Sequence, residues 1–179
     1  MQRLIAVALL LLAGGATTPA RAPDDGAMPA LRLAPAALGR ELALQQRLSF
    51  EHGERRDSVD ALVEVDASSL RLVMHAQGQV VLRLTWDGTV LDQQRADWLP
   101  AALSAERVLD DLQLVYWPAE AVNAALPAGW HLREHAGQRE LMHHDEVVAT
   151  VSFPDPTRAR LRQHRQDYLL DIQSAPVTP

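Results

Sequence analysis

Residues 80–93, with the sequence VVLRLTWDGTVLDQ, decide the fold. Apolar side chains stand at every second position from Val80 to Trp86, so they share one face of a β-strand. The pair Asp87-Gly88 follows, and an Asp-Gly pair between two alternating runs is typical of a hairpin turn. Residues 89–93 then return as the second strand. The stretch therefore predicts an antiparallel hairpin.

The same alternation continues toward the N-terminus. Ala61, Val63 and Val65 share one face of a strand, and Leu70 and Met74 belong to another alternating run. These runs predict a meander of antiparallel strands from about residue 44 to residue 94.

The periodicity becomes helical after this meander. Apolar residues recur at steps of three and four, at Ala105, Val108, Leu109, Leu112 and Val115. Ser104 is suited to cap the start of this helix, and Pro118 ends it because proline cannot donate the helical hydrogen bond. Pro118 is also suited to begin a second short helix that runs to Leu126.

Alternating segments resume beyond the helices, at residues 130–134, 138–144, 146–153, 158–165 and 168–173. A long sheet must cover its apolar face, and the two central helices are the elements that can cover it. We therefore predict a mainly β (α+β) fold, a curved half-open antiparallel β-barrel with two central helices on the concave face.

The N-terminus predicts export. A short positive start precedes the apolar run Leu4–Leu12, and Ala20-Arg21-Ala22 fits the cleavage pattern of a secretory signal peptide. The domain organisation we expect is a signal peptide at residues 1–22, a flexible tether at 23–40, one domain at 41–174 and a tail at 175–179. The predicted location is the periplasm, in association with the outer membrane.

Leu12-Ala13-Gly14 matches the residues that precede the acylated cysteine of bacterial lipoproteins, but Gly15 stands where that cysteine would be. Three explanations remain open: a soluble relative of lipoproteins, a replaced cysteine, or a chance likeness of a cleavage region rich in small residues. The position of Gly15 puts membrane anchoring in doubt.

Composition excludes several classes of function. The 179 residues contain 17 basic residues, all arginine, and 23 acidic residues. Without residues 1–22, which hold Arg3 and Arg21, 15 basic residues face 23 acidic ones, a net charge of −8. An acidic surface repels phosphate backbones, so we expect no nucleic acid partner. The sequence has no cysteine, which excludes disulfides, thiolate metal sites and cysteine nucleophiles.

The sequence offers no catalytic constellation. His143 and His144 are adjacent, so on a strand they point to opposite faces. Asp110 and Asp111 are about 100° apart on the predicted helix, which suits solvation or arginine pairing better than acid–base work. We therefore predict no enzyme, no cofactor and no metal site.

Two sets of residues are candidates for binding. Arg158, Arg160 and Arg162 share one strand face and predict contact with anionic headgroups or an acidic partner, the alternative being a solvated outer face. Aromatic and apolar residues of the helical section and its flanks are candidates for the lining of an apolar ligand cavity, with ordinary core packing as the alternative. They are Trp86, Trp98, Leu109, Leu112, Tyr116, Trp117 and Trp130.

The order of leader, strands, two helices and strands resembles the LolA/LolB group of outer-membrane lipoprotein carriers. Residues 109–118, LDDLQLVYWP, resemble the signature of uncharacterised LolB-like lipoproteins that are often encoded with aryl polyene (xanthomonadin-type) pigment genes. The resemblance extends over about residues 44–173. It implies a half-open β-barrel with a helical lid and an apolar interior for acyl chains. Gly15 departs from this family, and the turn at 75–79 lacks the protruding apolar side chain of LolB.

Two functions from different classes follow. The first is a carrier or receptor for an acyl or polyenyl chain or a lipoprotein, with the outer membrane's inner leaflet or a LolA-like carrier as further partners. The second is an accessory scaffold that docks on an envelope biosynthetic complex and binds no small ligand. They differ in whether the space beneath the helices is empty or packed. An enzyme is the third hypothesis. It would need a cluster of titratable side chains with shifted pKa values inside the barrel, which a sequence alone does not reveal.

Overall fold

The computed structural model describes residues 28–99 and 103–177. The predicted signal peptide and the first residues of the predicted tether lie outside the described residues. The elements, in chain order, are η1 (Pro35–Leu38), β1 (Leu42–His52), β2 (Arg55–Val65), β3 (Leu70–Ala76), β4 (Gln79–Trp86), β5 (Leu91–Arg95), α1 (Ala105–Tyr116), α2 (Ala119–Ala125), β6 (Trp130–His135), β7 (Gln138–His143), β8 (Glu146–Asp155), β9 (Arg158–Gln163) and β10 (Tyr168–Pro176).

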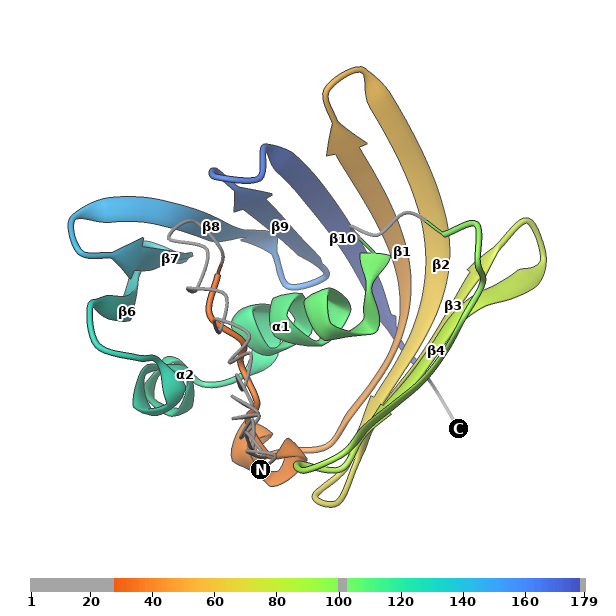
Figure 1. The fold of residues 1–179 in the computed structure, drawn as a ribbon, viewed down its shortest axis with the longest axis horizontal. Helices are drawn as coiled ribbons and strands as arrows, with labels where there is room; N and C mark the ends of the chain where they lie inside the picture. Colours follow the sequence, from red (N-terminus) through yellow and green to blue (C-terminus); the bar gives the residue numbers. More distant parts are fainter. Residues whose placement is uncertain (1–27, 100–102, 178–179) are drawn as a thin grey trace, which may run out of the picture.

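All the strands join in one ten-stranded antiparallel sheet in the order β5-β4-β3-β2-β1-β10-β9-β8-β7-β6. The prediction of a mainly β, antiparallel fold with two central helices is confirmed. Two meanders, β1–β5 and β6–β10, meet where β1 pairs with β10 (Figure 1). The sheet is not closed, because β5 and β6 are its two edges.

The Asp87-Gly88 hairpin is confirmed and has a clear local cause. The Asp87 carboxylate accepts hydrogen bonds from the backbone N–H groups of Thr89 and Val90, each at 2.7 Å. Gly88 takes a φ of +99°, which side chains disfavour. The turn is longer than a two-residue hairpin loop, so β5 begins at Leu91 rather than at Thr89.

Both predicted helices form at the expected places. The Ser104 hydroxyl accepts a hydrogen bond from the Arg107 N–H and caps α1, and Pro118 separates α1 from α2. Helix α1 lies in the hollow of the bent sheet (Figure 1). Helix α2 lies beside the edge strand β6, where the Asn123 amide exchanges two hydrogen bonds with the backbone of Leu132. Helix α1 therefore lies over the sheet, whereas α2 lies at its edge.

The flexible tether predicted at residues 23–40 is wrong from Met28 onward. Leu31 is fully buried, and Leu38 is 3% exposed. The segment packs against α1 because the sheet covers only part of that helix, and the Leu31 N–H donates to the Asp110 carboxylate at 2.9 Å. Leucines at alternate or nearby positions within the Pro- and Ala-rich stretch were the signal for this burial.

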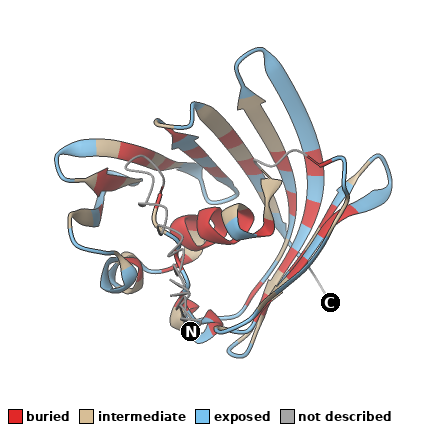
Figure 2. Cartoon of the chain, viewed as in Figure 1, coloured by how far each residue is buried: buried red, intermediate tan, exposed pale blue. Residues whose placement is uncertain are grey.

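The core lies between the sheet and α1. Figure 2 shows buried residues in bands along the strands and over most of α1. The last strand continues to Pro176, so the ordered domain extends past the predicted end at residue 174. Within the described residues, none of the helices has the length and apolarity needed to cross a membrane.

Candidate functional site

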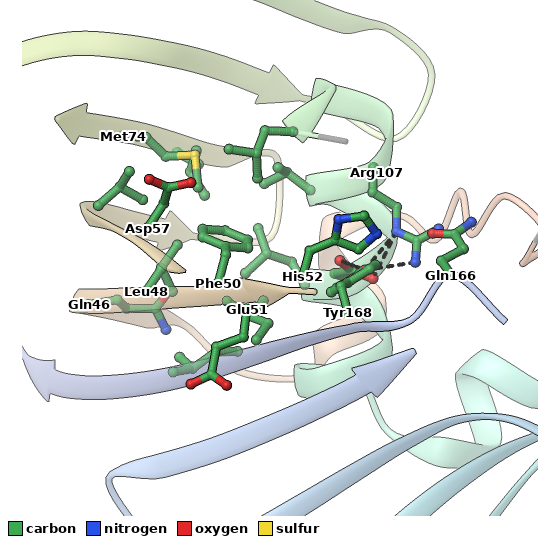
Figure 3. Close-up of a pocket in the computed structure, with 18 of the residues that line it drawn as sticks. Gln46, Leu48, Phe50, Glu51, His52, Asp57, Met74, Arg107, Gln166 and Tyr168 are labelled. Atoms are coloured by element: carbon green, nitrogen blue, oxygen red, sulfur yellow. Dashed lines mark hydrogen bonds and ion pairs between the residues drawn. The ribbon is translucent and has the colours of Figure 1, made fainter. Parts of the chain in front are cut away.

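A cavity of about 240 Å³ lies between the sheet and α1. Figure 3 shows side chains from β1, β2, β3, α1 and β10 around it. Most of its wall is apolar, formed by Leu48, Phe50, Val59, Leu72, Met74, Leu103, Val108, Leu112, Leu170 and Ile172.

Strand register places these side chains together. Leu48 on β1 is paired with Val59 on β2 and with Ile172 on β10. Because paired residues point to the same face of a sheet, the three side chains form one row across neighbouring strands. The cavity is thus built from residues that are distant in sequence and adjacent in register.

A polar network of Arg107, Asp111, Tyr168 and Gln163 lies beside the apolar wall. The Tyr168 hydroxyl donates to Asp111 Oδ2 at 2.5 Å and accepts from Arg107 Nε and Nη2 at 2.9 and 2.7 Å. Asp111 Oδ1 accepts from Gln163 Nε2 at 3.1 Å and lies 3.3 Å from Arg107 Nε. The two charges of the network therefore compensate each other.

Burial dominates the electrostatics of this network. It raises the pKa of Asp111, and the Arg107 guanidinium opposes that rise. It also raises the pKa of the Tyr168 hydroxyl, and the nearby Asp111 carboxylate adds to the effect. Tyr168 is therefore a neutral hydrogen-bonding group at physiological pH.

The cavity also has charged and polar residues at the adjoining ends of β1 and β2, and one in the β9–β10 turn. These are Glu51, His52, Arg55, Asp57 and Gln166. Glu51 pairs with Arg56 at 2.7 Å. The cavity thus combines an apolar wall with polar groups that come largely from the adjoining ends of β1 and β2.

Of the predicted cavity residues, the structure places Leu112 in the cavity wall. Leu109 is fully buried elsewhere in the core. The indole N–H groups of Trp86 and Trp117 donate to the carbonyls of Leu33 and Ala34, at 2.8 and 3.2 Å. These two tryptophans hold the N-terminal segment.

The other aromatic candidates also lie outside the cavity wall. The Tyr116 hydroxyl accepts a hydrogen bond from Gln46 at 2.5 Å, behind the wall that Gln46 helps to form. Trp130 is half-buried and stacks on His143 with ring centroids 4.5 Å apart. Trp98 is 64% exposed, near the turn between β3 and β4.

Arg158, Arg160 and Arg162, the arginine stripe, lie on one exposed face of β9, as the alternation predicts. Arg160 pairs with Asp171 at 2.8 Å, and Arg162 lies 3.5 Å from Asp167. Both contacts are on the outer face of the sheet, away from the cavity. Contact of the stripe with headgroups or an acidic partner stays a prediction.

The neighbouring acids of α1 are buried rather than solvated, and both pair with arginine. Asp110 lies 2.5 Å from Arg32 Nη1, in the N-terminal segment, and Asp111 lies in the cavity network. Burial raises the pKa of Asp110 to about 6, although Arg32 lowers it. Among the described residues, no three histidine, aspartate or glutamate side chains are grouped as a metal site.

Sequence reasoning missed most of the cavity. The alternation in β1 and β2 gives the inward face, but not which strands lie side by side. Tyr168 and Gln163 reach Asp111 across 57 and 52 residues, a link that only the fold makes.

Comparisons with known proteins give one family and distant structural neighbours. No curated protein matches the chain. The crystal structure of a DUF1329 family protein from Desulfovibrio piger ATCC 29098 aligns with a TM-score of 0.38 and 10% identity, over 79% of this chain and 87% of that one. The model of the family described as "Protein of unknown function (DUF3261)" matches residues 43–176. The chain belongs to the DUF3261 family.

Proposed function

We propose that this protein is a non-enzymatic envelope protein that binds an acyl or polyenyl chain in the cavity beneath α1. The observation that supports this most is the apolar wall of that cavity, contributed by four adjacent strands, β3, β2, β1 and β10, and by helix α1. An accessory scaffold with no small ligand has no need of such a space. In this proposal the bent sheet acts as a half-open barrel, and α1 acts as its lid.

The energetics favour a single flexible chain. Each methylene moved from water into the cavity contributes about 0.8 kcal/mol, against the cost of association. A volume of about 240 Å³ is smaller than the roughly 300–1,000 Å³ typical of sites for drug-sized ligands. A long chain therefore either leaves part of its length outside or moves α1.

The biological setting we propose is the periplasmic face of the outer membrane. The leader-like residues 1–22 and the resemblance of residues 109–118 to LolB-like proteins of aryl polyene gene clusters support this setting. The cargo is then a lipid, a polyenyl chain or the acyl part of a lipoprotein. The partners are the inner leaflet of the outer membrane or a LolA-like carrier.

Native mass spectrometry of the protein, purified from bacterial cells without detergent, tests the proposal. We expect a bound species of lipid mass that dodecanoic acid displaces. A ligand-free mass, together with no binding of the neutral dye N-phenylnaphthylamine or of dodecanoic acid, would contradict the proposal and favour the docking scaffold.

A matched pair of variants locates the site. Val59→Phe adds volume inside the cavity, and Leu62→Phe adds an aromatic ring on the opposite, exposed side of the same strand. We expect Val59→Phe to weaken dye binding about tenfold, a loss of about 1.4 kcal/mol, because the added ring occupies space that the dye needs, and Leu62→Phe to leave it unchanged. Circular dichroism of both variants checks that they fold. Equal dye affinity in the two variants would place the ligand elsewhere.

A further inference from the structure

The cavity contains a cation within its mainly apolar surroundings. The Arg107 side chain is 14% exposed and lines the cavity from the first turns of α1. Its guanidinium lies over the Tyr168 ring, 5.1 Å from the centroid. In Figure 3, Arg107, His52 and Tyr168 are drawn together near Gln166. An arginine at this position is costly unless its donors are used.

The donors of Arg107 are used only in part. Its Nε and Nη2 atoms donate to the Tyr168 hydroxyl, and Nε also faces Asp111. Among the described residues, none accepts a hydrogen bond from Nη1. Nη1 therefore retains two N–H groups that can donate to a ligand.

The acceptors of the two network partners of Arg107 that line the cavity, Asp111 and Tyr168, are in contrast already engaged. Asp111 Oδ2 accepts from Tyr168, and Asp111 Oδ1 accepts from Gln163 and faces Arg107. The Tyr168 proton is committed to Asp111. The network thus offers hydrogen-bond donors to a molecule in the cavity, which selects a ligand that brings acceptor oxygens.

The charged residues at the adjoining ends of β1 and β2 act in opposite directions on an anionic ligand. Arg55 and Asp57 both line the cavity, and neither forms an ion pair with another described residue. Glu51 is neutralised by Arg56. Arg55 therefore favours an anion near the cavity, and Asp57 disfavours it.

From this arrangement we propose that the ligand is a single-chain amphiphile with a carboxylate head, whose oxygens accept hydrogen bonds from Arg107 while its chain lies along the apolar wall. The proposal rests on the proposed function, because it requires that a chain enters the cavity. A carboxylate brings two acceptor oxygens in one plane, a geometry that suits guanidinium N–H donors. A phosphate would bring more negative charge than a carboxylate beside Asp111, and a second acyl chain would exceed the space.

The test compares two ligands that differ only in the head group. Dodecanoic acid and dodecan-1-ol are titrated against the full chain loaded with N-phenylnaphthylamine, at neutral pH and below their aggregation limits. We expect the acid to bind at least about tenfold more tightly than the alcohol, the range given by a charge-assisted hydrogen bond. Arg107→Gln removes this preference, and Arg107→Lys retains part of it. Both substitutions lower the affinity for the acid by a larger factor than the affinity for the alcohol.

If the Arg107 variants fail to fold, variants at three exposed positions, Arg55, Asp57 and Arg83, test the carboxylate proposal instead. Arg55→Gln weakens acid binding by about two- to fivefold, and Asp57→Asn strengthens it by a similar factor, because both are solvent-screened charges. Arg83→Gln makes the same change of charge as Arg55→Gln on the exposed face of β4, outside the cavity lining, and serves as the control. It leaves acid binding unchanged.

The outcomes separate the two proposals. Equal affinity for acid and alcohol overturns the carboxylate proposal and leaves chain binding intact. A preference for the acid that survives in folded Arg107→Gln overturns the assignment to Arg107. If Arg55→Gln and Asp57→Asn change acid binding in the same direction, the carboxylate does not lie near these two charges, and the carboxylate proposal is overturned. Failure of both ligands to displace the dye, or of the dye to bind, overturns chain binding and the carboxylate proposal together.

Discussion

Two neighbouring carboxylates on α1 have different environments and different tasks. Asp110 faces the N-terminal segment and accepts from the Leu31 N–H and the Arg32 guanidinium. Asp111 faces the cavity and joins Arg107 and Tyr168. A step of one residue turns a helix by about 100°, which directs the two side chains into separate surroundings. Burial and pairing, rather than the residue type, decide what each acid does.

Asp110→Asn should change how stability depends on pH. The pKa of Asp110 is about 6 in the folded protein and 3.8 in its ordinary state, so the folded state binds the proton more tightly. Stability contributed by this group is present below about pH 4 and is lost as the pH rises to about 6. The difference between the two pKa values corresponds to a change of at most about 3 kcal/mol in the free energy of unfolding. Urea unfolding from pH 4 to pH 7 should give a smaller loss of stability for Asp110→Asn than for the wild type.

The control for this experiment is Asp145→Asn, in the exposed turn between β7 and β8. It should keep the pH dependence of the wild type. An unchanged pH dependence in Asp110→Asn would mean that Arg32 compensates the burial of Asp110 fully.

At the scale of elements, the N-terminal segment is a part of the core. Gln113 is fully buried on α1 and uses its amide to pair with both backbone groups of Leu33, accepting at 3.2 Å and donating at 2.9 Å. Trp86 donates to the same Leu33 carbonyl. The segment therefore connects α1 to β4, and its contacts stabilise the position of the helix over the sheet.

Leu31→Ala measures this contribution. A fully buried leucine leaves a cavity when truncated, so we expect a loss of about 2–5 kcal/mol in the free energy of unfolding. Leu62→Ala, on the exposed side of β2, should lose less than about 1 kcal/mol. Chemical denaturation of the two variants makes the comparison. A negligible effect at Leu31 would restore the interpretation of this segment as a tether.

At the scale of the molecule, the β1–β10 pair holds the two meanders together. The register runs from Leu44 paired with Pro176 to His52 paired with Tyr168, and β1 pairs with β2 along its whole length. The edge strands β5 and β6 each have one neighbour. The centre of the sheet should therefore open last.

Hydrogen exchange followed by mass spectrometry tests this order. After correction for intrinsic rates, we expect peptides from β1 and β10 to be protected with the free energy of global unfolding, and peptides from β5 and β6 to exchange earlier. Two meanders that exchange as separate units would contradict a single cooperative sheet.

The local elements were predictable because their causes are local. The strands around Asp87-Gly88, the Ser104 cap and the break at Pro118 each depend on neighbours within a few residues. The packing of residues 28–38 was not predictable in the same way, because the alternate leucines, Leu31 and Leu33, do not indicate what they pack against. The place of this segment depends on the part of α1 that the sheet leaves uncovered.

In the candidate site, too, features with a local cause were predictable, and features that depend on tertiary packing were not. Leu112 was predicted from the helical repeat and lines the cavity. The tryptophans were predicted to line the cavity because aromatic residues often line ligand sites. Trp86 and Trp117 instead donate hydrogen bonds to the N-terminal segment. The cavity network joins α1 to β9 and β10, which no local pattern connects.

The sequence by itself determined the strands, the two helices and their order, since hydrophobic period, caps and proline act over one or two turns of chain. Only the tertiary structure decided which strands are neighbours, where the N-terminal segment packs and where space remains beneath α1. The physical reason is that alternation specifies which face of a strand is buried but not what it is buried against. Neighbouring strands, a covering segment and a cavity are set by the packing of the whole chain.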